Sequence, residues 1–111
     1  MIVDENQIAW AAGFYEGEGS LFVATIRKNG RSYGYLRMTI TSTDLDVLYH
    51  FKTVVECGRI YEKKIKEINR KPAWWWQNNN SEFTCEIIKN FWPYLGERRR
   101  ETALELGVYL I

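Results

Sequence analysis

The sequence has few of the residues that build covalent or metal cross-links. It contains two cysteines, Cys57 and Cys85, and a single histidine, His50. A structural zinc site takes four Cys or His ligands, and disulfide-stapled domains carry several paired cysteines. We therefore expect two free thiols and neither kind of framework.

Long apolar runs are also missing. No stretch approaches the ~18 consecutive apolar residues of a membrane-spanning helix, and the first thirty residues lack the basic start and apolar run of a signal peptide. We expect a soluble, intracellular protein (cytoplasm, nucleoid or organelle) with no membrane partner. At 111 residues and 46% hydrophobic, residues 1–111 are long enough to form one compact domain.

Basic residues are absent from the first twenty positions, which carry only acidic charges. The acidic residues there are Asp4, Glu5, Glu16 and Glu18. The middle of the chain is rich in basic side chains, among them Arg27, Lys28, Arg31, Arg37, Arg59, Lys63, Lys64, Lys66, Arg70 and Lys71. The net charge of +1 hides this asymmetry, and charge alone neither demands nor excludes a nucleic-acid partner.

Capping residues, turn signals and hydrophobic periodicity predict the order αββαββαα. The predicted helices run from an Asp4 cap to about Gly17, from Thr43 or Asp44 to about Glu56, from Asn80 or Ser81 to near Pro93, and from about Glu97 to Tyr109. The predicted strands are Leu21–Lys28 and Tyr33–Thr41, joined by Asn29-Gly30, then Arg59–Lys66 and Trp74–Gln77. This order predicts the α+β class, with a four-stranded antiparallel sheet backed by helices.

The first predicted helix has a face almost without side chains. Ala9, Gly13 and Gly17 are spaced by four, so they lie on one side of the helix. Each interior glycine costs ~1 kcal/mol relative to alanine, and close contact with another backbone would offset that cost. No other predicted helix has a matching stripe, so we infer pairing with the same helix of a second copy. The alternative is packing against the chain's own sheet.

Two carboxylates stand at the unfavourable end of that helix. Glu16 and Glu18 face the negative end of the helix dipole, which costs ~0.3–1 kcal/mol each. Two paired helices would bring such carboxylates together, where a hard divalent cation such as Mg²⁺ would neutralise them. Solvated carboxylates at a frayed helix end are the alternative.

The residues around these carboxylates resemble a known family. Ala11–Gly19 is similar to the nine-residue LAGLIDADG motif of homing endonucleases and related maturases, and Ser20 follows as it often does there. Later blocks resemble the same family in the same order: Ile40–Asp44, Cys57–Tyr61, Trp76-Gln77 and Trp92–Arg99. The chain departs from the motif in having Glu at both acidic positions and Ala11 in place of the leading Leu.

The resemblance implies roles for individual residues. Glu18 matches the metal-binding acidic position, next to Gly17, and Glu16 matches an acidic position that is mainly structural. Arg98 falls where the family often has a Lys near the active site. Ser42 falls where it often has a Gln that positions solvent, a departure that leaves activity open. The implied dimer contacts are Ala9, Ala12, Gly13, Glu16 and Gly17.

The resemblance further implies a Mg²⁺-dependent endonuclease acting on double-stranded DNA. A single motif implies a homodimer that cleaves a long, near-palindromic target, with the sheet along the major groove; intron, intein and free-standing genes are all compatible with such a homing role. On the first strand neither parity is clearly apolar, and the motif favours the even residues. The expected DNA-facing residues are Ser20, Phe22, Ala24, Ile26, Lys28, Arg31, Tyr33, Tyr35, Arg37, Thr39, Arg59, Tyr61, Lys63, Trp75 and Gln77.

Three other functions remain open. The chain could be a DNA-binding regulator without cleavage, a maturase that binds intron RNA, or a structural dimer with no target. Both carboxylates are retained, which favours the nuclease, because a pure binder would gain from neutralising them next to phosphate.

Overall fold

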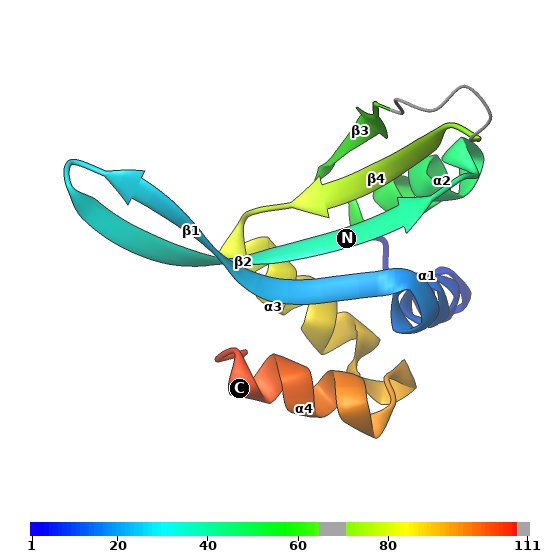
Figure 1. The fold of residues 1–111 in the computed structure, drawn as a ribbon. Helices are drawn as coiled ribbons and strands as arrows, with labels where there is room; N and C mark the ends of the chain where they lie inside the picture. The colour runs from blue at the N-terminus through cyan, green and yellow to red at the C-terminus, as the bar shows by residue number, and fades with distance from the viewer. Residues whose placement is uncertain (65–70, 109–111) are drawn as a thin grey trace.

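The computed structural model describes residues 1–64 and 71–108, which form a four-stranded sheet packed against helices (Figure 1). The elements in chain order are α1 (Glu5–Glu18), β1 (Gly19–Lys28), β2 (Arg31–Ser42), α2 (Leu45–Val55), β3 (Arg59–Lys63), β4 (Ala73–Asn78), α3 (Ser81–Phe91), the 3₁₀ turn η1 (Trp92–Tyr94) and α4 (Glu97–Glu105). The predicted αββαββαα order and α+β class are confirmed.

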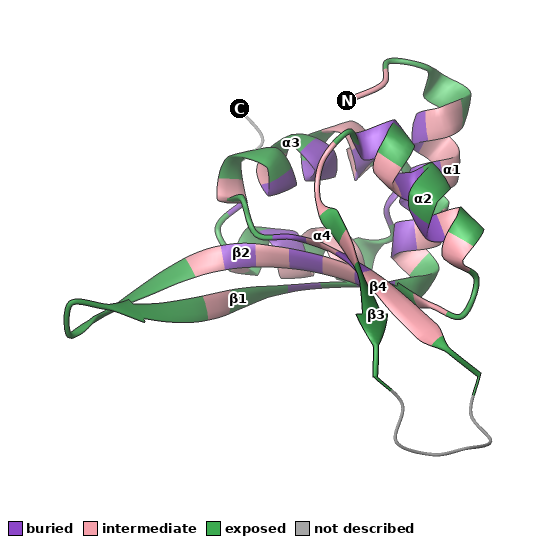
Figure 2. Cartoon of the chain, turned by 90° about the horizontal axis from the view of Figure 1, so that it is seen from above, coloured by how far each residue is buried: buried purple, intermediate pink, exposed green. Residues whose placement is uncertain are grey.

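All strand pairs are antiparallel, and their spatial order is β1-β2-β4-β3. The β1–β2 turn is the predicted one: Asn29 and Gly30 both have positive φ, 55° and 76°, as a two-residue hairpin with the right twist requires. The outer part of this hairpin extends well beyond the helices (Figure 1). It is exposed along both strands (Figure 2).

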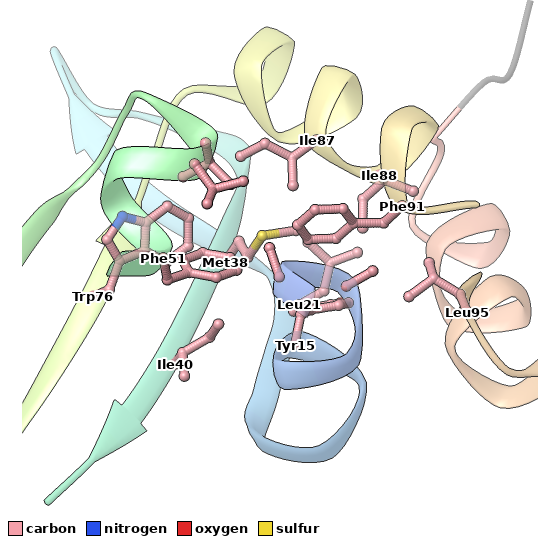
Figure 3. Close-up of a cluster of buried hydrophobic side chains, with 14 of the residues drawn as sticks. Tyr15, Leu21, Met38, Ile40, Phe51, Trp76, Ile87, Ile88, Phe91 and Leu95 are labelled. Atoms are coloured by element: carbon pink, nitrogen blue, oxygen red, sulfur yellow. The ribbon is translucent and has the colours of Figure 1, made fainter. Parts of the chain in front are cut away.

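The core lies between the helices and one face of the sheet (Figure 3). Alternate residues of β2, Leu36, Met38 and Ile40, are buried there, as pattern and period predict. Trp76 of β4 is fully buried, and its indole Nε1 donates to the carbonyl of Cys57 at 2.8 Å. Trp74 is half-buried and packs against the same cluster, so its predicted core-side position is confirmed.

Local signals set several helix ends. The Asp4 carboxylate caps α1 by accepting from the Gln7 N–H at 3.0 Å, and the Asn80 side chain caps α3 by accepting from the Phe83 N–H at 2.9 Å. The final helix ends at Glu105, earlier than predicted, because Gly107 turns the chain with φ +90°. The predicted ends at Lys66 and Tyr109 lie outside the described residues.

Cys57 and Cys85 are free and half-buried. Across residues 1–64 and 71–108, no helix has the length and apolar character needed to cross a membrane.

Candidate nucleic-acid interface and metal-binding helix end

The two carboxylates at the end of α1 have different surroundings. Glu16 is half-buried, and its Oε2 accepts a hydrogen bond from the Gly96 N–H at 3.2 Å. Gly96 caps the N-terminus of α4, where a negative charge is favourable. Glu18 is exposed, and among the described residues its side chain has no hydrogen-bond or ion-pair partner. Glu16 therefore ties two helices together, whereas Glu18 is available to a ligand.

Arg99 contacts the same helix end, which the sequence analysis missed. Its Nε and Nη2 donate to the Glu16 carbonyl at 3.2 and 3.1 Å, and its guanidinium lies 5.1 Å from the Tyr15 ring centre. A cation at a helix C-terminus offsets the dipole. Burial raises the pKa of Tyr15, and the Arg99 charge opposes that rise. Arg98, the predicted active-site residue, is exposed on the first turn of α4 and makes no side-chain hydrogen bond within the described chain.

Substitutions of Arg98 and Arg99 should therefore have very different effects on the free energy of unfolding. Arg99→Met removes two hydrogen bonds and a helix-end cation, so the free energy of unfolding should fall by about 2 kcal/mol. Arg98→Met should change it by less than about 0.5 kcal/mol, as for most exposed positions. Urea unfolding of both variants measures the difference. Equal losses would contradict the assignment of Arg99 as the residue that anchors α4 to α1.

Five of the glycines divide into two groups by what surrounds them. A Cβ on Gly19 would overlap the Tyr15 ring, one on Gly58 the Trp76 indole, and one on Gly96 would come 2.8 Å from the Glu16 carboxylate. These three glycines are explained within the chain. A Cβ on Gly13 or Gly17 would meet nothing within 4 Å. Both lie on an exposed part of α1, so packing within the chain does not account for them.

The prediction that Ala12 lies in the dimer interface is wrong. Ala12 is fully buried in the chain's own core. It belongs to the helical stripe Ile8, Ala11, Ala12 and Tyr15, which faces inward at the spacing of a buried helix side. Ala9 is half-buried, and Gly13 and Gly17 are exposed, so these three define the small-residue face of α1.

The strand register decides which side chains share a face of the sheet. Phe22 of β1 is paired with Arg37 of β2, Thr39 of β2 with Gln77 of β4, and Trp75 of β4 with Tyr61 of β3. Directly paired residues point to the same side. All the predicted DNA-facing residues therefore lie on one side, opposite the core, which we call the open face: Ser20, Phe22, Ala24, Ile26, Lys28, Arg31, Tyr33, Tyr35, Arg37, Thr39, Arg59, Tyr61, Lys63, Trp75 and Gln77.

The open face carries charge of one sign. Within the described strands, its charged residues are all basic: Lys28, Arg31, Arg37, Arg59 and Lys63. Exposed aromatic side chains lie among them, and the Tyr61 and Trp75 rings stack with centres 5.1 Å apart. Interleaved basic and aromatic residues suit phosphates and bases together.

Ser42 lies at the end of β2 on the opposite parity from the open face. It is half-buried, and its Oγ accepts from the Asp44 N–H at 3.0 Å, which fixes the turn into α2. This bond gives Ser42 a structural role that the sequence did not indicate. Its expected role in positioning solvent stays a prediction.

The donor atoms at the helix end fit a hard divalent cation. Within residues 1–64 and 71–108, no three His, Cys, Asp or Glu side chains gather as a metal site. One chain thus offers the Glu18 carboxylate and neighbouring backbone oxygens such as that of Gly17. Mg²⁺ is commonly held by one or two carboxylates, with water and phosphate oxygens completing its shell. The exposed Glu18 therefore fits a cation shared with a phosphate.

A sheet face with interleaved basic and aromatic side chains is typical of nucleic-acid-binding proteins. The model of the LAGLIDADG endonuclease family matches residues 11–101. The chain belongs to that family.

Solved structures share the fold at low sequence identity. The homing endonuclease I-CvuI, in complex with the I-CreI target, matches with a TM-score of 0.72 and 17% identity over 92% of this chain and 64% of that one. I-CeuI complexed with DNA matches with a TM-score of 0.70 and 20% identity, covering 95% and 53% of the two chains. The present chain thus spans less than two thirds of these relatives. No curated protein sequence matches it.

Proposed function

We propose that the chain is a divalent-metal-dependent, site-specific endonuclease that cleaves a near-palindromic double-stranded DNA as a homodimer. The observation that carries this proposal is the open face, whose charged residues are all basic and which begins at Ser20, two residues after the exposed Glu18. A face of this kind contacts DNA, and the carboxylate lies where the contacted strand begins.

The shape of the sheet supports placement in the major groove. That groove is ~12 Å wide and admits a two-stranded β-ribbon, and each base pair shows a distinct pattern of donors and acceptors there. The β1–β2 hairpin is such a ribbon, free of helices on both sides in its outer part. Its exposed apolar side chains on the open face include Phe22 and Ile26, which suit contact with thymine methyl groups and sugars.

The small-residue face of α1 supports the homodimer. Gly13 and Gly17 leave the backbone of α1 bare, and each costs ~1 kcal/mol in a monomer. A second copy packed on that face would recover the cost through close contact. Pairing the two α1 helices would also bring both Glu18 carboxylates to the centre of the dimer, where two DNA strands can be cut.

Each residue of the site would have a distinct task in phosphodiester hydrolysis. A bound divalent cation supplies an activated water and stabilises the departing oxygen. Glu18 from each copy would hold the cation, with the backbone oxygen of Gly17 beside it. Arg98 would offset the charge that develops on the phosphate oxygens. Glu16 and Arg99 would hold α1 and α4 in place, because both already bond across that junction.

A non-cleaving binder is the second candidate, and Ser42 is the observation that favours it. Its Oγ already accepts a backbone hydrogen bond, which leaves it less free to position solvent. A maturase that binds RNA would use the same face.

Selection of cleaved sites from a randomised duplex library with Mg²⁺ tests the proposal. We expect recovered ends to derive from one near-palindromic sequence, with no cleavage in EDTA. Specific binding without cleavage under any divalent metal would instead identify the non-cleaving binder. Preference for RNA over duplex DNA would identify the maturase.

A further inference from the structure

A hydrogen-bonded network crosses the open face from β4 to β2. The Trp75 indole Nε1 donates to Gln77 Oε1 at 3.1 Å, and Gln77 Nε2 donates to Asn79 Oδ1 at 3.1 Å. Arg37 Nε donates to the same Asn79 oxygen at 2.8 Å, and Arg37 Nη2 donates to the Tyr35 hydroxyl at 2.6 Å. Five side chains are thereby fixed relative to one another, and we call them the donor network.

Chemistry fixes the direction of every amide in this network. An indole N–H and a guanidinium can only donate. The Gln77 atom beside Trp75 must therefore be its oxygen, and the Asn79 atom beside Arg37 must be its oxygen too. Gln77 then has its nitrogen toward Asn79, as observed. If either amide were rotated by half a turn, its nitrogen would face the Trp75 indole N–H or the Arg37 guanidinium. Neither of these groups can accept a hydrogen bond, so the bond would be lost.

The hydrogen bonds within the network occupy acceptor atoms, and several N–H and O–H donors are left free to bind a ligand. The Asn79 oxygen accepts from both Arg37 and Gln77, which fills its two lone pairs and leaves its N–H₂ group unused. Arg37 keeps N–H groups beyond the two it uses, and Tyr35 keeps its O–H because it accepts from Arg37. The surface offered to a ligand is therefore rich in donors.

The network is held rigidly and is reachable from outside. The Arg37 guanidinium lies 5.9 Å from the Phe22 ring centre and 5.5 Å from that of Tyr35, and Trp75 stacks on Tyr61. Gln77 and Asn79 line an open hollow of about 340 Å³ together with Arg59 and Tyr61. The neighbouring asparagines are committed elsewhere, because Asn78 is buried and Asn80 caps α3. All three asparagines line the hollow, and Asn79 is the one whose side chain bonds to Arg37 and Gln77.

We propose that the donor network reads guanine in the major groove, with Arg37 as the base-contacting residue and Trp75 and Asn79 as positioning residues. Guanine offers two adjacent acceptors there, N7 and O6, whereas adenine and cytosine each present an amino donor. Gln77 would otherwise suit adenine through its amide oxygen, but the bond from Trp75 occupies one of the two lone pairs of that oxygen and fixes the direction in which the amide points. This inference rests on the proposed DNA function. Phosphate oxygens are the other acceptor-only partner, and the experiment separates the two.

The first measurement is binding selection from a duplex library with randomised positions, in Ca²⁺ to suppress cleavage. We expect guanine to exceed adenine by about tenfold or more at one position of each half-site. Replacing that guanine by 7-deazaguanine, which lacks N7, should weaken binding several-fold. Phosphate contact would instead give no base preference, and Arg37→Lys would then weaken all sequences alike; that result would overturn the inference.

Trp75→Phe tests the positioning role. It keeps an aromatic ring against Tyr61 but removes the indole N–H, so both lone pairs of the Gln77 oxygen become available and the amide can turn toward adenine. The guanine preference should fall below about threefold, measured as the ratio of affinities for guanine and adenine at that position, in which a general change in DNA affinity cancels. Trp74→Phe is the matched control, since it makes the same change on the core side of β4 and should keep the preference. Asn79→Ala, at an exposed position, should also reduce the preference without affecting folding.

The outcomes separate this inference from the proposed function. In one outcome, the unaltered chain, Trp75→Phe and Asn79→Ala all bind the same sequence with the same specificity. That result would overturn the guanine-reading role of the donor network and leave the proposed function standing. An unaltered chain that enriches no sequence would overturn the proposed function, and this inference with it.

Discussion

Glu18→Gln should abolish DNA cleavage while preserving the fold and DNA binding. The change removes one negative oxygen ligand from each copy and keeps the shape of the side chain. Loss of the cation should lower the single-turnover cleavage rate by about a thousandfold or more, corresponding to about 4 kcal/mol of barrier. Glu18 is exposed and has no partner in the described chain, so the free energy of unfolding should change by less than about 0.5 kcal/mol. In EDTA, DNA affinity should be equal or higher, because a charge that repels phosphate is gone.

Glu16→Gln is the matched control, with the same chemical change two residues earlier. Glu16 accepts from the Gly96 N–H, and an amide oxygen can still accept there, though more weakly. This variant should lose some stability and retain most of its cleavage rate. Comparable loss of cleavage in both variants would contradict the division between a metal-binding Glu18 and a structural Glu16. Full activity of Glu18→Gln would contradict the proposed function itself.

Gly13→Leu should abolish dimerisation without destabilising the single chain. A Cβ at position 13 meets nothing within 4 Å, and leucine has a better helix propensity than glycine by ~1 kcal/mol. The isolated fold should therefore be as stable as before, or slightly more so. In a symmetric dimer both copies would carry the leucine into a tight contact. Overpacking costs ~1–3 kcal/mol at each of the two sites, so the dimer should dissociate between about thirtyfold and about ten-thousandfold more readily.

Sedimentation equilibrium at micromolar concentration measures this effect, alongside urea unfolding. Glu101→Leu provides the control, because it places a leucine at an exposed position of α4 that is about 200° around the helix from Arg99, the residue that contacts α1. It should leave the dimer intact. An unaltered chain that sediments as a monomer at micromolar concentration would show that the helix pairing is wrong even though the fold is right. Loss of stability in Gly13→Leu would show that α1 packs differently within the chain.

The first strand shows where sequence reasoning reaches its limit. Alternation of apolar and polar residues identifies a buried face only when one side of a strand is covered and the other is exposed to solvent. The outer part of β1 is exposed on both sides, as the exposure of both Phe22 and Val23 shows. The sequence there carries no contrast between faces. Only the pairing of Phe22 with Arg37 across β2 placed the even residues on the open face.

The helix ends show the same division. Asp4 and Asn80 were identifiable as caps because the groups they bond lie three residues away in the chain. Arg98 and Arg99 were not separable, because neighbours on a helix point about 100° apart and the direction of α1 from α4 depends on the whole packing. The contact between Arg99 and Glu16 spans 83 residues of sequence, and no local pattern reports it.

The sequence by itself determined the order of elements, the Asn29-Gly30 turn, the motif that contains Glu18 and the family, because each depends on neighbours within a few residues. The tertiary structure decided which small residues face a partner. The space beside Gly58 is occupied by Trp76, the space beside Gly96 by Glu16, and Ala12 is enclosed in the core. Beside Gly13 and Gly17 the space is empty. Whether a small residue has space beside it depends on segments far away in the chain, and only folding brings those segments together.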